Sequence, residues 1–95
     1  MRAKVILSSA ALSQLTIIGD YIAEDSPTAA VKMIQAIESK CESLSLLPNR
    51  GAQFRDQYRR VFIGPFQIIY RVDDTDPQPT VVIITIHHTA QERVQ

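Results

Sequence analysis

The sequence has little of what marks secreted, metal-binding or fibrous proteins. Its one cysteine, Cys41, cannot form a disulfide within the chain, and no motif resembles a metal cluster. A cytoplasmic location is therefore expected, with no metal and no other cofactor. Glycine and proline number only 3 and 5, whereas hydrophobic residues make up 45% of the 95 residues. This composition excludes a disordered, collagenous or low-complexity protein and predicts a folded core.

The sequence also lacks an excess of either charge, and it lacks long apolar runs. Ten basic and ten acidic residues give a formal net charge of zero. Proteins that hold nucleic acid mainly by neutralising phosphates are strongly basic, so no direct sequence-specific binding of nucleic acid is expected. The longest apolar run, residues 81–84, is far shorter than a membrane span, and no membrane association is expected. The length fits one domain over residues 1–95.

The first half of the chain predicts a short strand and two helices. Residues 3–7 form a β-rich run that ends at Ser8 and Ser9, which are good N-cap residues for a helix. Apolar side chains then recur every three or four residues over 11–24 and again over 26–47, as they do along one side of an amphipathic helix. Because the two stripes nearly adjoin, the helices must form an antiparallel hairpin.

The second half changes to the two-residue period of β-strands. A turn and a polar loop occupy residues 48–57. Hydrophobic residues then alternate over 60–63 and over 66–72, on either side of Gly64-Pro65. This pattern predicts a β-hairpin.

The last strand is predicted over residues 81–86. This run is apolar on both faces, which indicates an interior strand in which Ile84 is buried. The predicted order is therefore β-α-α-β-β-β. It describes an α+β fold in which a helical hairpin packs on a small, mainly antiparallel sheet.

Charge is distributed unevenly along the chain. Residues 20–42 contain five acids and two bases, whereas residues 50–71 contain five arginines and one acid. The helical half is therefore acidic and the loop and sheet half is basic. This asymmetry suggests a polar partner for the sheet, although solvated strand and loop arginines would give the same pattern.

Six short segments, in this order and at this spacing, are typical of one known group of proteins. They are Tyr21-Ile22-Ala23, Ser26-Pro27-Thr28-Ala29-Ala30, Pro48-Asn49-Arg50-Gly51, Arg59-Arg60-Val61-Phe62-Ile63-Gly64, Ile68-Ile69-Tyr70-Arg71-Val72 and Ile86-His87-His88. Together they resemble the toxins of the ParE/RelE superfamily, on the ParE-like side, over about residues 5–90.

The resemblance implies the toxin of a bacterial type II toxin–antitoxin system. Such a toxin is neutralised by a ParD-like antitoxin, which is expected along the helical hairpin and the sheet edge, in a heterotetramer or beside a toxin homodimer. ParE-like toxins inhibit DNA gyrase and block replication, whereas RelE-like toxins cut messenger RNA on the ribosome. Because one fold carries both activities, the choice depends on the site. The alternatives to gyrase inhibition are a RelE-like endonuclease and a degenerate toxin that retains only antitoxin binding.

Metal-independent RNA cleavage needs a general base, cationic groups around the phosphate and a general acid. Gln67 stands where RelE-like nucleases often carry an arginine, and no tyrosine follows Tyr70. All the lysines precede the sheet hairpin. These differences favour gyrase inhibition by binding, with no catalytic residue.

Two histidines end the last predicted strand and are the best remaining acid–base candidates. Strict alternation places His88 on the face of Val82, Ile84 and Ile86, and His87 on the opposite face. By resemblance, His88 aligns with the histidine of ParE-like toxins. The structural alternative is a strand-end histidine that only hydrogen-bonds locally.

Arginines supply most of the remaining candidates. Arg59 aligns with a recurrent arginine of ParE-like toxins, and its guanidinium could bind a phosphate or carboxylate, or brace a loop through backbone carbonyls. After the histidines the family commonly has an arginine, but here Gln91 follows and Arg93 is displaced by two. Candidates for contact with the target are Arg59, Arg60, His88, Gln91 and Arg93. Candidates for contact with the antitoxin are Tyr21, Arg50, Arg59 and Arg71.

Overall fold

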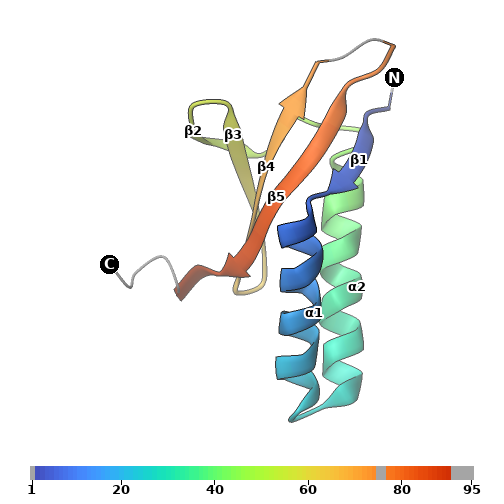
Figure 1. Cartoon of the computed structure of the whole chain (residues 1–95), viewed down its shortest axis with the longest axis vertical. Coiled ribbons are helices and arrows are strands. Elements are labelled where there is room, and N and C mark those ends of the chain that lie inside the picture. Colours follow the sequence, from blue (N-terminus) through green and yellow to red (C-terminus); the bar gives the residue numbers. More distant parts are fainter. Residues whose placement is uncertain (1, 75–76, 91–95) are drawn as a thin grey trace.

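In the computed structural model, which describes residues 2–74 and 77–90, two helices lie against one face of a five-stranded sheet (Figure 1). The helical hairpin and the mainly antiparallel sheet confirm the predicted α+β class. The elements are β1 (Lys4–Leu7), α1 (Ser9–Ala23), α2 (Pro27–Ser43), β2 (Ala52–Arg55), β3 (Tyr58–Ile63), β4 (Phe66–Asp73) and β5 (Thr80–His88).

The strands lie in the order β1-β5-β4-β3-β2. β1 runs parallel to β5, and every other pair is antiparallel. β5 is therefore interior, as its apolar sequence predicted. β2 is an addition, because its residues were expected to lie in a loop. This edge strand is short, mostly exposed and interrupted by a bulge, so it carries no alternating pattern.

The helix starts follow the predicted capping. The Ser8 hydroxyl accepts the Ala11 N–H at 3.0 Å and donates to the Ile84 carbonyl at 2.7 Å, so it caps α1 and ties it to β5. Ser26 accepts the Ala29 N–H at 3.1 Å, directly before the proline that begins α2.

A two-residue turn joins β3 to β4. Gly64 has a φ of +54°, and Pro65 follows it. A positive φ at the first turn position, with proline second, fits a type II′ hairpin turn. This turn fixes the register in which Ile63 lies opposite Phe66.

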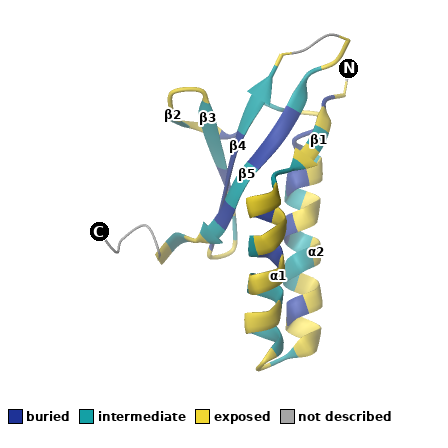
Figure 2. Cartoon of the chain, in the orientation of Figure 1, coloured by how far each residue is buried: buried dark blue, intermediate teal, exposed yellow. Residues whose placement is uncertain are grey.

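The core lies between the hairpin and the sheet. Its largest fully buried side chains include Ile37 and Leu44 from the helical half, and Ile68, Tyr70 and Ile83 from the sheet. Figure 2 shows buried residues along β5 and exposed residues along much of α1. The tip of the hairpin extends beyond the end of the sheet (Figure 1).

Pairing between β4 and β5 shifts by one residue in the middle of the strands. Ile69 lies opposite Thr85, but Tyr70 lies opposite Ile83, so Ile84 is an extra residue in β5. Such a β-bulge shifts the alternation of side chains by one residue. Residues beyond the bulge therefore lie on the face opposite to the one that regular alternation predicts.

The bulge corrects two predictions made from strict alternation. Ile83 and Ile86 are both buried and belong to the same core, whereas Ile84 is only partly buried. His88 therefore lies on the helix side with Ile83 and Ile86, and not on the face of Ile84. His87 lies on the opposite side of the sheet.

Candidate functional site

A groove lies between α1 and the end of the sheet at which Phe66 begins β4 and His88 ends β5. It has a volume of about 660 Å³, and the described residues that line it include no acidic residue, lysine or arginine. Tyr21 is its most exposed large apolar side chain, with 75% of its surface accessible. Its lining includes Ile17, Tyr21 and Ile22 of α1, Met33 of α2, Phe66 of β4 and His88 of β5. The groove can therefore accept apolar side chains.

Gln14 links α1 to β5 along this groove. Its Oε1 atom accepts the Ile86 N–H at 2.7 Å and the Thr85 hydroxyl at 2.9 Å. β1 pairs with β5 only as far as Ile83, so this glutamine takes the place of a neighbouring strand beside the end of β5.

His88 lies at the rim of the groove. Its ring packs edge-on against Phe66, with 5.5 Å between ring centroids, and its Nδ1 atom accepts the Ala90 N–H at 3.1 Å. This is the local strand-end hydrogen bond that the structural alternative predicted. A neutral His88 must carry its proton on Nε2, because Nδ1 is the acceptor.

A second cluster lies at the end of the helical hairpin opposite its tip, where it holds the turn that follows α2. The Tyr70 hydroxyl donates to the Pro48 carbonyl at 2.7 Å and accepts the Gly51 N–H at 2.9 Å. Burial raises the pKa of the Tyr70 phenol above its ordinary value. The fit is tight, because a Cβ atom on Gly51 would lie 2.6 Å from the Tyr70 hydroxyl oxygen.

Arg59 belongs to this second cluster. Its NH1 atom donates to the carbonyls of Asn49 and Gly51 at 3.2 and 2.8 Å. Arg59 therefore braces the turn through backbone carbonyls, which is one of the two roles expected for it. Arg50, in the same turn, donates to the Ser43 hydroxyl at 3.3 Å.

A third cluster lies on the side of the sheet away from the helices, here called the helix-free face. Arg60 donates from NH1 to Oε1 of Gln67 at 3.0 Å, and the amide nitrogen of Gln67 is 3.0 Å from Nε2 of His87. Gln67 is fully buried, whereas Arg60 and His87 are partly buried.

The chemistry of Arg60 fixes the protons in this cluster. A guanidinium only donates, so Oε1 of Gln67 must face Arg60 and the NH₂ group must face His87. Nε2 of His87 must then accept, which places the proton of a neutral imidazole on Nδ1. The three side chains thus form one directed chain from Arg60 through Gln67 to His87.

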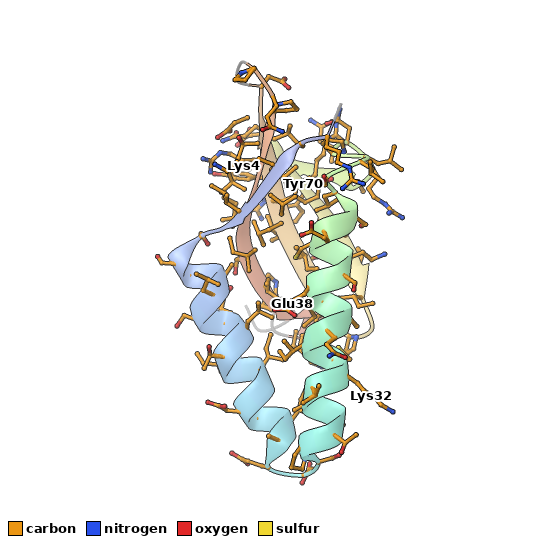
Figure 3. All side chains as sticks on the ribbon, turned by 90° about the vertical axis from the view of Figure 1, so that its right-hand side faces the viewer. Lys4, Lys32, Glu38 and Tyr70 are labelled. Carbon is orange, nitrogen blue, oxygen red and sulfur yellow. The ribbon has the colours of Figure 1, made fainter. Side chains whose placement is uncertain are left out.

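The candidate residues fall into separate places. Tyr21 and His88 both line the groove, whereas Arg50 and Arg59 lie at the other end of the hairpin. Figure 3 shows both ends of the helical hairpin, with Tyr70 near the upper end of α2 and Lys32 near its lower end. Gln91 and Arg93 lie outside the described residues.

Arg71 pairs within its own strand. Its Nε atom lies 2.9 Å from the Asp73 carboxylate, and this hydrogen bond raises the pKa of the Arg71 guanidinium. Arg71 does not line the groove that holds Tyr21.

The Arg60–Gln67–His87 cluster was not predicted as a unit. The turn between β3 and β4 sets Arg60 diagonally across from Gln67, and this pairing could have been derived from the sequence. Its link to His87 depends on the β4–β5 register, which no local signal in the sequence gives.

Residues 2–74 and 77–90 form neither a metal site nor a membrane-spanning helix. Within these ranges no three His, Cys, Asp or Glu side chains come close enough to hold a metal ion. In the same part of the chain no helix is long and apolar enough to cross a membrane.

Comparison with known proteins identifies the class that this fold and these sites define. The family model for the ParE toxin of type II toxin–antitoxin systems, parDE, matches residues 5–93. The chain therefore belongs to the ParE toxin family, within the ParE/RelE superfamily of type II toxins.

Individual relatives agree with this assignment. "Toxin RelE2" of Caulobacter vibrioides is 36% identical over 90 residues, which cover 94% of this chain and 98% of that protein. The chromosomal ParDE toxin–antitoxin system of P. aeruginosa contains a similar fold, with a TM-score of 0.74, 22% identity, and coverage of 92% of this chain and 96% of that chain. The toxin–antitoxin complex RelBE2 of Mycobacterium tuberculosis gives a TM-score of 0.67 at 22% identity, covering 93% and 99%.

Proposed function

We propose that this toxin acts in the cytoplasm by binding and inhibiting DNA gyrase, and that a ParD-like antitoxin neutralises it by occupying the groove beside α1. Membership of the ParE family, over nearly the whole chain, is the observation that supports the gyrase target. The apolar groove supports an antitoxin segment that binds as an amphipathic helix.

The arrangement of side chains favours inhibition by binding over catalysis. General acid–base cleavage needs two groups that exchange protons with the substrate. Among the described residues of the helix-free face, His87 is the one imidazole, and the Gln67 amide occupies its Nε2 atom. Arg59 and His88 belong to clusters at different ends of the hairpin.

A supercoiling assay with purified gyrase tests the target. The toxin should block supercoiling, and the product of the adjacent antitoxin gene should restore it. Unchanged supercoiling at a large excess of toxin, together with arrested translation, would contradict the proposed target.

The antitoxin site makes a prediction about Ile17. This exposed groove residue should contact apolar side chains of the antitoxin, so Ile17→Asp should weaken antitoxin binding at least tenfold, or about 1.4 kcal/mol. Val31→Asp is the matched control, because Val31 is also an exposed apolar helix residue but does not line the groove. Calorimetric titration measures both affinities, and equal weakening by the two variants would place the antitoxin elsewhere.

Ribosome-dependent cleavage of messenger RNA is the second candidate. The relative named Toxin RelE2 and the proximity of Arg60 to His87 are the observations that favour it. Primer extension on translated message would reveal cleavage sites that depend on the toxin. Normal growth on expression without antitoxin would instead indicate a degenerate toxin that retains only antitoxin binding.

A further inference from the structure

One arginine on the helix-free face is fixed by several neighbours. The Cζ atom of Arg60 lies 4.7 Å from the ring centroid of Phe54 and 5.4 Å from that of Phe62, and NH1 bonds to Gln67. An arginine ordinarily loses much rotamer freedom when it binds a ligand. Arg60 has lost that freedom on folding, so it is preorganised for a rigid contact.

The charge around Arg60 indicates an acidic ligand. Residues 50–71, which include all of β2 and β3 and most of β4, contain five arginines and one acid, so this part of the sheet is basic. Arg55 lies beside the same Phe54 ring as Arg60 and adds a second positive charge. A carboxylate binds a guanidinium through two parallel hydrogen bonds, and a basic surface attracts it.

The apolar surroundings indicate that this ligand belongs to a protein. Phe62 has 47% of its surface exposed, although it contacts Arg60. An arginine beside an exposed aromatic ring is typical of the energetic centre of a protein–protein interface. The zero net charge of the chain disfavours a nucleic acid strand as the alternative.

We propose that Arg60 and Phe62 form the centre of the surface that contacts the target protein. Arg60 receives a carboxylate of the target, and Phe62 packs against an apolar side chain beside it. Gln67 and His87 are positioning residues that hold Arg60 in place. This inference deepens the proposed function, and it requires a protein target without requiring that the target be gyrase.

Gln67 supports this assignment because a polar side chain at its buried position tends to lower the stability of the fold. A buried amide is destabilising unless both of its ends are bonded, and here Arg60 and His87 bond them. The adjacent strand residues Ile68 and Ile69 are apolar and are also buried. A hydrophobic residue would serve the fold at position 67, so the glutamine is explained by what it holds.

The test compares three variants in growth arrest and in gyrase supercoiling. Arg60→Ala should raise the toxin concentration needed for half-inhibition at least ~10-fold, and Gln67→Leu roughly 3- to 10-fold. Lys32→Ala, which removes one exposed positive charge from α2, away from the helix-free face, should change it less than about 2-fold. The melting temperature of Gln67→Leu should stay close to that of the wild type, because this variant replaces a bonded polar group by an apolar one of similar size. Arg60→Ala removes the partner of the buried Gln67 Oε1 atom, so it should melt at a lower temperature and still fold.

A spectroscopic readout separates positioning from a purely structural role. Nitrogen NMR of the His87 ring should show the proton on Nδ1 in the wild type. In Gln67→Leu the ring should shift toward the tautomer protonated on Nε2, because the amide no longer donates to that atom.

Each outcome decides one proposal. Full activity of Arg60→Ala and Gln67→Leu overturns the inference, as does a wild-type chain that arrests no growth. A wild type that arrests growth without inhibiting gyrase overturns the gyrase target alone, and the ranking of variants by growth arrest then decides the inference. Binding of a labelled single-stranded RNA that Arg60→Ala abolishes would show a nucleic acid ligand and overturn the carboxylate assignment.

Discussion

At the scale of the residue, neighbouring arginines of one strand have different tasks. Arg59 faces the turn after α2 and donates to two of its carbonyls, whereas Arg60 lies on the helix-free face and bonds to Gln67. The difference follows from the alternation of side chains along β3. A substitution at either position therefore tests a different property of the protein.

The bracing role of Arg59 makes a stability prediction. Arg59→Ala removes two charged hydrogen bonds and should lower the free energy of unfolding by about 1–3 kcal/mol. Urea unfolding measures this, with Arg55→Ala as an exposed control that should cost less than about 0.5 kcal/mol. Equal stability of the two variants would show that the brace contributes nothing, and Arg59 would return to the candidates for target contact.

Sequence reasoning succeeds where the signal is local. The caps at Ser8 and Ser26 were predictable because a hydroxyl before an apolar stripe acts within three residues. The partners of Gln67 were not predictable, because they come from two other strands. The directed chain of hydrogen bonds exists only once both registers are set.

At the scale of the element, the bulge in β5 decides which side chains reach the core. Residues 81–84 of β5 are all apolar, so this part of the sequence contains no indication of where alternation is interrupted. The Ser8 hydroxyl bonds to the carbonyl of the extra residue, Ile84, and Gln14 bonds to the next two residues. Contacts from α1 thus hold the bulge in place.

The bulge predicts unequal effects for two adjacent isoleucines. Ile83→Ala empties a fully buried position and should cost about 2–5 kcal/mol, whereas Ile84→Ala should cost less than about 2 kcal/mol because that side chain is only partly buried. Thermal or urea unfolding of the two variants measures the difference. A larger loss for Ile84→Ala would mean that the strand alternates regularly in solution.

At the scale of the whole molecule, stability should fall in alkaline solution. Burial, reinforced by the negative charges of Glu38 and Glu42, raises the pKa of the Cys41 thiol from 9.0 to about 11. In this range the unfolded chain releases the proton before the folded one, so the stabilising contribution is complete below about pH 9 and is lost as the pH rises toward 11. The pKa of the Tyr70 phenol is raised in the same direction. Tyr70 therefore adds to the loss of stability once the pH exceeds the ordinary pKa of a tyrosine.

The free energy of unfolding should therefore drop by about 2 kcal/mol between pH 9 and pH 11 because of Cys41. Urea unfolding across this range measures the slope, and the slope should be smaller in Cys41→Ala. An identical slope in both proteins would assign the alkaline sensitivity to other groups.

The tip of the helical hairpin extends past the sheet, so the sheet does not cover the apolar side chains there (Figure 1). There Ile18, Ile22 and Met33 pack against the core only in part, and Ile17 and Tyr21 are left to solvent. Local unfolding should be easiest in such a segment, because few buried contacts oppose it. An antitoxin helix in the groove would supply the missing layer of this core. Neutralisation would then be the last step of the toxin's own folding, completed by a second chain.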